Sequence, residues 1–416
     1  MDTSPLRDSG PFRAAFAARA VSLVGIGLLV VTVPAQTYAL SGSSLHVAAV
    51  SVVTAAGVFL GALGGGVLAD RCERRRTISW ARAVAGLCFV ALGVNALLPQ
   101  PSLLVVYLAS AVDGAAGGVS SAALMAVSST LVRRDQLAAA GALIVLTTDV
   151  GTVAGPALAG VLLAAGGTAA TYFAAAGATA ATVLLLRGLG PCPPPPRRDT
   201  SGALRAVADG IGFAARHRLA RGVLVVGTLA VVLAGPLVLL PAYVEEVLGA
   251  GPRTLGLLYA APAVGAVLAS LTSGWTARAS GGVAVLAVAV MAAGPLGAGV
   301  AGTTVVAALA LAVHGAARAV GDVVRFALLQ AGIPDAVRGR VSGLWQVQVL
   351  AGTAIGSGLA GLLGRWFDPA TALVVHGAVG VVAAAVVAVC LRRTWRPPDG
   401  RAVQAGEMTT TTGGAR

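Results

Sequence analysis

Apolar residues fill this chain in blocks long enough to cross a bilayer, about 20 residues each, and short polar or glycine- and proline-containing segments separate them. Irregular backbone cannot face lipid, because its amide and carbonyl groups would lack partners, so the blocks are expected to be helical. The pattern predicts twelve membrane-spanning helices, at residues 14–40, 47–69, 77–98, 103–131, 137–164, 169–187, 221–247, 254–277, 282–300, 303–331, 340–364 and 370–391.

The composition favours the same class, an all-α polytopic membrane protein. Of the 416 residues, 57% are hydrophobic and 11% are charged, whereas soluble chains carry roughly a quarter charged residues. Disordered chains are polar, so disorder is excluded as well. The net charge of +13 comes entirely from arginine. We attribute that bias to a GC-rich genome, and we expect no nucleic-acid partner because there is no soluble surface to present the charge.

The residues needed for catalysis or metal binding are not grouped in any familiar pattern. Cys72, Cys88, Cys192 and Cys390 are scattered, so neither a disulfide framework nor a metal site is expected. We find no nucleophile–base pair and no nucleotide-binding loop, so an enzyme is not expected and no cofactor is implied. No cleavable signal peptide is evident.

Arginines mark alternate loops and so predict the orientation. They gather before the first span, in the second–third, fourth–fifth, eighth–ninth and tenth–eleventh loops, in the middle segment and in the tail, while the intervening loops hold only Arg253 and Arg365. Positive residues stay on the cytoplasmic side. We therefore expect both termini in the cytoplasm and the protein in a bacterial cell membrane.

The chain is expected to divide into four parts: residues 1–187 and 221–393 as six-helix bundles, 188–220 as a cytoplasmic linker, and 394–416 as a flexible tail. The linker opens with the proline-rich stretch 191–196, which favours an extended backbone. Residues 202–218 have the pattern of an amphipathic helix on the membrane surface. We interpret this segment as a connector without a ligand.

The two halves are related by duplication. Residues 108–119 and 309–320 share eight of twelve positions, and 151–162 and 352–363 share seven of twelve, at the same offset of 201. A six-helix unit repeated in parallel around a midplane site is one transporter architecture. The chain resembles the major facilitator superfamily in this respect, and the resemblance implies two bundles that rock to expose a central site to each side in turn.

Two motifs extend the resemblance. Residues 66–76 (GVLADRCERRR) are similar to the superfamily signature between helices two and three, which implies a cytoplasmic latch formed by Gly66, Asp70, Arg71, Arg74 and Arg75. Glycine at 66 would let two helices approach closely, and Asp70 could cap a facing helix or accept from arginine. The simpler interpretation of the arginines is positive-inside topology alone.

The fifth span carries Gly151, Gly155, Pro156 and Gly160, which resemble the signature of antiporter-type exporters. Such glycines permit close packing, and the proline bends the helix. Generic tight packing is the alternative interpretation.

Ionisable residues inside the spans are the sharpest functional signal, because each is unfavourable there unless paired or hydrated. Asp113 and Asp149 fall near the middle of the fourth and fifth spans, and His314, Arg318, Asp322 and Arg325 form one stripe along the tenth. We predict Asp113 as the proton carrier, paired with an arginine such as Arg19 or Arg318 or titrating, with Asp322 and Asp149 as further candidates. An internal ion-pair ladder is the structural alternative for the tenth span.

Other polar and aromatic side chains are candidates for the substrate cavity: Gln36, Tyr243, Trp345 and Gln346, together with His314, Arg318 and Arg325 of the stripe. Interhelical hydrogen bonding is at least as good an explanation for each uncharged one taken singly.

Within the superfamily the chain resembles the enterobactin exporters, through stretches such as 18–36, 65–76, 255–266 and 334–345. The resemblance implies proton-coupled export of a catecholate siderophore by a monomer whose partners are substrate, protons and lipid. Arg318 and Arg325 would complement an anionic ligand. Two alternatives stay open: multidrug or antibiotic efflux by a similar antiporter, and a membrane sensor or scaffold without transport.

Overall fold

A computed structural model describes residues 4–128, 136–189, 212, 216–272, 274, 280–332 and 335–391. Within these ranges the backbone is helical nearly throughout and contains no strand, as the sequence predicts. The N-terminal helices are α1 (Ser4–Asp8), α2 (Gly10–Ser41), α3 (Ser44–Arg71), α4 (Arg74–Leu97), α5 (Leu103–Ser128), α6 (Leu137–Leu186) and η2 (Arg187–Leu189). The C-terminal helices are α8 (Arg218–Val232), η3 (Gly235–Leu239), α9 (Leu240–Ala242), η4 (Tyr243–Val247), α10 (Pro252–Leu271), α11 (Gly281–Gly299), α12 (Thr304–Gly332), α13 (Asp335–Trp366) and α14 (Pro369–Leu391).

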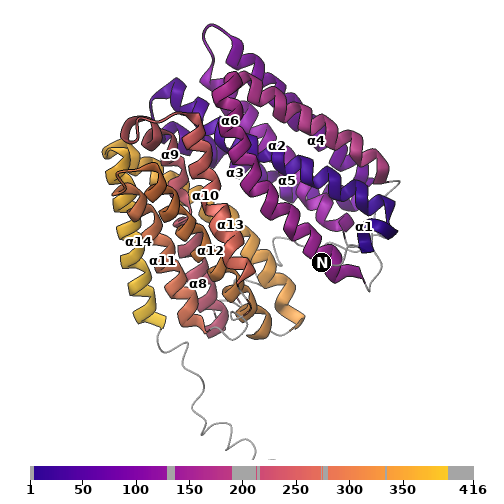
Figure 1. Ribbon diagram of the computed structural model, residues 1–416. Coiled ribbons are helices and arrows are strands. Elements are labelled where there is room, and N and C mark those ends of the chain that lie inside the picture. The colour runs from indigo at the N-terminus through magenta and orange to yellow at the C-terminus, as the bar shows by residue number, and fades with distance from the viewer. Residues whose placement is uncertain are drawn as a thin grey trace, which may run out of the picture.

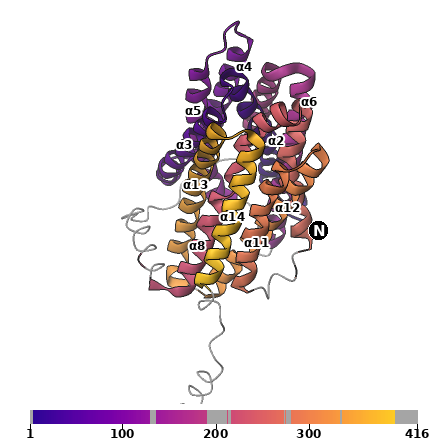
Figure 2. The ribbon, with the colours of Figure 1, turned by 90° about the vertical axis from the view of Figure 1, so that its left-hand side faces the viewer.

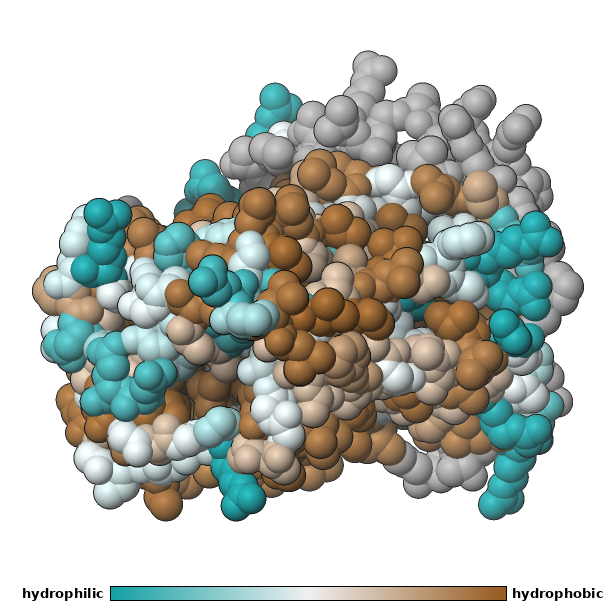
Figure 3. Space-filling view, turned by 90° about the horizontal axis from the view of Figure 1, so that it is seen from above, coloured by the Kyte–Doolittle hydropathy of each residue, from teal (hydrophilic) through white to brown (hydrophobic). Residues whose placement is uncertain are grey.

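The helices form two bundles that lie side by side, one from each half of the chain (Figures 1 and 2). Within the described residues, eleven helices are long and apolar enough to cross a membrane. Large apolar side chains remain exposed along them, and Figure 3 shows apolar residues in continuous areas with hydrophilic ones in separate groups. Such a surface requires lipid rather than water around it.

The longest helix, α6, contains two of the predicted spans. It runs for 50 residues, and Gly167 in its middle has φ 74° and ψ −173°, a backbone conformation that favours glycine. The chain folds back there, because both arms pack on α2: a Cβ at Gly27 would lie 2.6 Å from Gly155 Cα, and one at Gly25 would lie 3.2 Å from Ala178 Cβ. Counting both arms, the described helices supply all twelve predicted spans.

The local sequence explains where helices begin and end. Ser9 caps α2 by accepting a hydrogen bond from the Phe12 amide at 3.2 Å. Gly42, with φ 59°, ends the same helix in the left-handed conformation.

The seventh span, predicted as one helix over 221–247, is instead α8 followed by η3, α9 and η4. Pro236 and Pro241 lack the amide protons that a continuous helix would need there. The predicted linker helix at 202–218 lies almost entirely outside the described residues.

Equivalent glycine contacts in the two bundles match the internal duplication. In the N-terminal bundle, a Cβ on Gly57 of α3 would press on the carbonyl oxygen of Ala111 in α5. In the C-terminal bundle, a Cβ on Gly265 of α10 would press on that of Ala312 in α12. Only glycine, which has no side chain, allows two helix backbones to approach this closely. The two bundles therefore share the same glycine-mediated helix contact at equivalent positions.

The specific contacts that join the bundles gather at one end of the molecule, where α2 ends and α3 begins. There α6 meets α10, where a Cβ on Gly160 would lie 2.9 Å from Gly256 Cα, and α3 meets α13, where a Cβ on Gly361 would meet Ala48 and Ser44. We call this the closed end. The opposite end, where α3 ends and α4 begins, carries Arg74, Arg75 and Arg76, and we call it the arginine-rich end. The axes of the bundles diverge away from the closed end (Figure 1).

Candidate functional site

A pocket of about 440 Å³ opens on the C-terminal bundle between α8, α12 and α13. Arg318, Asp322 and Arg325 of α12 and Trp345 of α13 supply its polar and aromatic lining, and Ala, Val, Phe and Thr side chains supply the remainder. Three of the four residues of the stripe predicted along the tenth span, Arg318, Asp322 and Arg325, therefore line this pocket. A pocket that is mostly apolar with a few converging polar groups is the usual form of a ligand site.

The three charged residues form a ladder along α12. Arg318 Nε lies 3.7 Å from Asp322 Oδ2, and Arg325 Nη2 pairs with Asp322 Oδ1. Arg325 is 2% exposed, donates from Nε to the Gly321 carbonyl at 3.1 Å, and lies 5.2 Å from the Trp345 ring centroid. Its guanidinium is thus held by a carboxylate, a carbonyl and an aromatic face.

Arg318 has a different environment. Its side chain is 56% exposed and its contact with Asp322 is long, so the guanidinium can turn toward a ligand without losing a strong bond. Two guanidinium groups share one carboxylate, which leaves a positive charge in the pocket. The structural alternative, an ion-pair ladder, is present, and it coexists with a cationic group that a ligand can reach.

Four predicted cavity residues do not lie in this pocket. His314 is buried, with Nδ1 2.8 Å from the Met291 carbonyl oxygen, so it joins α12 to α11. Gln36 accepts a hydrogen bond from Tyr172 at 2.7 Å, and Tyr243 donates to the Ala298 carbonyl at 2.6 Å. Both are buried between helices, because a polar group in an apolar interior needs a fixed partner. Gln346 is exposed but does not line the pocket.

Gln348, a further polar residue of the same span, joins two helices rather than lining the pocket. Its Nε2 donates to the Leu224 carbonyl and to Thr228 Oγ1, each at 2.6 Å, and so ties α13 to α8 beside the pocket. The helical repeat turns Gln346 and Gln348 to different faces, which residue type alone does not reveal.

A second polar cluster lies inside the N-terminal bundle. Asp113 of α5 is partly buried, and its carboxylate interacts electrostatically with the guanidinium of Arg82 on the neighbouring helix α4. Arg82 donates from Nε to Ser120 at 3.0 Å, and Arg19 of α2 donates to Thr148 of α6 at 3.0 Å. The arginine whose charge acts on Asp113 is thus Arg82, whereas the sequence suggested Arg19 or Arg318.

The cluster is incompletely satisfied. Arg19 Nε and Ser22 Oγ are buried without a hydrogen-bond partner, and they border a small cavity of about 50 Å³ that Arg82 and Ser120 also line. One water molecule needs about 30 Å³. The cavity can therefore hydrate this buried charge cluster.

Asp149 lies partly buried on the first arm of α6, at the residue after Thr148. Its backbone carbonyl accepts a hydrogen bond from Thr152 at 3.0 Å. Asp149 therefore follows directly on Thr148, the residue to which Arg19 donates. Asp322, the other candidate proton carrier, lies on α12 in the C-terminal bundle.

The latch motif is only partly described, since the side chains of Asp70 and Arg71 lie outside the described residues. Glu73, which stands where the signature has glycine, pairs with Arg75 at 3.3 Å and with Arg76 at 2.8 Å. Arg74 is half-buried. Gly66 does not make the close helix contact expected of it: nothing lies within 4 Å of its Cβ position, whereas one at Gly65 would lie 2.6 Å from Val119 Cα.

The glycines of the fifth-span motif pack against helices of both bundles. Gly151 and Gly155 contact Leu23 and Gly27 of α2, and Gly160 contacts Gly256 of α10. Pro156 follows Gly155, and its carbonyl oxygen would lie 2.6 Å from a Cβ at Gly256. This motif therefore connects a helix inside the N-terminal bundle to the contact between bundles.

Tyr38 forms the one side-chain hydrogen bond between bundles that the described residues show at the closed end, donating to Glu246 of η4. Tyr38→Phe should shift the equilibrium toward opening of this end by about fivefold, since a hydrogen bond to a charged group contributes roughly 1 kcal/mol or more. Spin labels at Gln100→Cys and Arg253→Cys, in a background without native cysteines, would report a longer distance distribution. Tyr107→Phe, which removes a bond to His46 within one bundle, should leave the distribution unchanged.

Curated proteins match the chain over nearly its whole length. The enterobactin exporter EntS of Shigella boydii is 36% identical over 405 residues, covering 96% of this chain and 97% of the relative. The protein of the same name from Escherichia coli O81 is 35% identical over the same shares.

Solved structures share the fold at low sequence identity. The nucleoside transporter NupG gives a TM-score of 0.72 at 14% identity, covering 91% of this chain and 98% of that one. A bacterial homologue of the human lysosomal transporter Spinster gives 0.73 at 13% identity, covering 96% and 100%.

Two duplicated six-helix bundles, closed against each other at one end and carrying charged clusters within the membrane, define a transporter of the major facilitator superfamily. The transmembrane secretion effector family matches residues 2–404. The chain belongs to that family, and it is a multi-pass membrane protein that carries a small-molecule substrate.

Proposed function

We propose that this protein exports a catecholate siderophore of the enterobactin type from the cytoplasm, in exchange for protons. Both termini and the arginine-rich end face the cytoplasm in this proposal, as the arginine distribution favours. The observation that carries it is the full-length similarity to enterobactin exporters together with a pocket whose exposed cation is Arg318.

The chemistry of the pocket suits such a ligand. A catechol has an aromatic ring and oxygens that accept hydrogen bonds and carry negative charge when deprotonated. Arg318 can donate to those oxygens, and Phe326 and Trp345 offer aromatic surface beside it. Apolar Val and Ala side chains on the remaining walls fit the ring edges.

Proton coupling is assigned to Asp113. It is a carboxylate within a span, the charge of the partly buried Arg82 acts on it, and Arg82 also lines a cavity large enough for water. Binding and release of a proton would change the net charge between α4 and α5, which gives the bundle two electrostatic states. Asp322 is less suited, because two arginines already pair with it.

The arrangement of the bundles fits the loading step. With the closed end toward the exterior, the divergent arginine-rich end would admit substrate from the cytoplasm. Rocking of the bundles would then close this end and open the other.

The test is uptake of purified enterobactin into inverted vesicles under an imposed pH gradient. The protein should accumulate enterobactin, and Arg318→Gln should reduce uptake roughly tenfold, the effect of losing one charge-assisted hydrogen bond of about 1.4 kcal/mol or more. Arg253→Gln, which removes an exposed arginine far from the pocket, should transport normally.

Absence of uptake by folded protein would overturn the siderophore assignment. Transport of a cationic dye under the same gradient would then favour drug efflux. Full uptake by Arg318→Gln would remove the α12 pocket from the proposal while leaving the transport function intact.

A further inference from the structure

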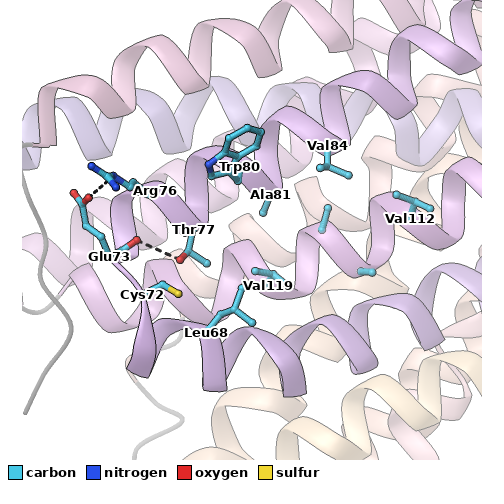
Figure 4. A pocket seen from close by; sticks show the side chains of 12 residues that line it. Leu68, Cys72, Glu73, Arg76, Thr77, Trp80, Ala81, Val84, Val112 and Val119 are labelled. Atoms are coloured by element: carbon cyan, nitrogen blue, oxygen red, sulfur yellow. Dashed lines mark hydrogen bonds and ion pairs between the residues drawn. The ribbon is translucent and has the colours of Figure 1, made fainter. Parts of the chain in front are cut away.

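A groove of about 730 Å³ runs along the outer side of the N-terminal bundle, between α3, α4 and α5 (Figure 4). It is separate from the pocket on the C-terminal bundle and from the Asp113 cluster, since it shares no lining residue with either. Its walls are largely apolar, and the hollow between them is open because Ala81, Ala115 and Ala116 provide only methyl groups.

The exposure of the walls shows that the groove faces lipid. Leu68, Val112 and Trp80 are 44%, 46% and 73% exposed, although they lie on long apolar helices. α4 packs on α5 and α6 at the periphery of its bundle. An acyl chain is the component of the membrane that fits such a hollow.

One end of the groove is polar. Cys72, Glu73, Arg76 and Thr77 lie there, at the arginine-rich end, and Trp80 follows one turn further into the membrane (Figure 4). Tryptophan prefers the level of the lipid headgroups. From Arg76 to Val84 the helix rises about 12 Å, so the groove leads from headgroup level into the hydrocarbon region.

The charge at this end is unbalanced. The Glu73 carboxylate is shared by Arg75 and Arg76, at 3.3 and 2.8 Å, so the three groups together retain one positive charge. Arg76 is 75% exposed, whereas Glu73 is 21% exposed and also pairs with Arg75. The hydrated Arg76 guanidinium therefore gains little from its ion pair, and Glu73 keeps a partner when Arg76 turns away. Arg76 can therefore exchange Glu73 for a phosphate at little cost.

We propose that this groove binds one anionic phospholipid, with an acyl chain against Ala81 and Ala115 and the phosphate on Arg76. The lipid belongs to the leaflet at the arginine-rich end. The proposal does not depend on the identity of the exported substrate. It adds a ligand site beside the latch loop, so that the lipid holds the α3–α4 connection from its outer side.

Trp80 is a built-in reporter for this site. The protein is reconstituted in phosphatidylcholine bilayers with small fractions of bromine-labelled phosphatidylglycerol or phosphatidylethanolamine, and the Trp80 signal is the difference between the protein and Trp80→Phe. Half-maximal quenching should need about fivefold less phosphatidylglycerol than phosphatidylethanolamine, the effect of one arginine near an anionic group. Arg76→Gln should abolish that difference, and Arg76→Lys should retain it.

Trp366, which is 70% exposed at the closed end, is the control after its exposed neighbour Arg365 is replaced by glutamine, and its quenching should then not distinguish the two lipids. Equal quenching of Trp80 by both lipids would overturn the proposal, because the groove would then hold bulk lipid regardless of charge. A preference that survives in Arg76→Gln would overturn the assignment of the phosphate to Arg76.

Discussion

Asp113→Asn is expected to abolish the pH-gradient dependence of enterobactin uptake into inverted vesicles. Asparagine keeps the size of the side chain but cannot bind or release a proton, so the charge next to Arg82 becomes fixed. Accumulation should fall to the level reached without a gradient. Downhill exchange of internal for external substrate should continue, because the pocket of Arg318 lies in the other bundle.

Asp149→Asn is the matched control for this result. It changes the same functional group in another span, and Arg82 is the charge that acts on Asp113. Asp149→Asn should therefore leave gradient-driven uptake within about twofold of the unmodified protein, the effect of about 0.5 kcal/mol. Asp113→Glu should restore coupling in part. Gradient-driven uptake by Asp113→Asn would contradict the assignment and transfer it to Asp149 or to the α12 ladder.

Gly256→Ala is expected to impair transport by preventing tight closure of the end where the bundles meet. The new Cβ would lie 2.6 Å from the Pro156 carbonyl oxygen and 2.7 Å from Gly160 Cα, and both are backbone atoms that cannot turn aside. Overpacking of this kind amounts to about 1–3 kcal/mol, which lowers the population of the closed arrangement roughly 5- to 150-fold. Transport should fall accordingly, and spin labels across the closed end should report longer distances.

Gly177→Ala provides the comparison for the packing effect. It is an exposed helical glycine with nothing within 4 Å of its Cβ position, and alanine there should be neutral or slightly stabilising. Normal transport by Gly256→Ala would show that the backbones can separate without loss of closure. That result would contradict the role given to the Gly160–Gly256 contact.

The spans could be predicted from the sequence, because lipid imposes one rule on every residue of a crossing helix. Local departures from this rule became visible only in the structure. The seventh span breaks into short turns at Pro236 and Pro241, although it is apolar along most of its length. The close helix contact is made by Gly65, the residue before the latch motif, rather than by Gly66. A one-residue change turns a helix face by about 100°, which a motif match does not resolve.

The candidate site was predicted less completely than the fold. The α12 stripe identified Arg318, Asp322 and Arg325, because charges in a span must face a cavity or a partner. His314 shares the stripe but bonds to Met291 of α11. Arg82 was missed, although a charge inside the predicted span 77–98 was itself a signal. Which arginine reaches Asp113 depends on how α4 and α5 cross, and a single sequence does not contain that information.

The turn at Gly167 has a mechanical consequence. The two arms of α6 are joined through a single non-helical residue, and each arm is fixed to α2, one by Gly27 and the other by Gly25. Neither arm can therefore slide along the membrane normal independently of the other. Any tilt imposed on the first arm at Gly160 is therefore passed to the second arm and to α2 together, so the N-terminal half moves as one body when the Gly160–Gly256 contact separates.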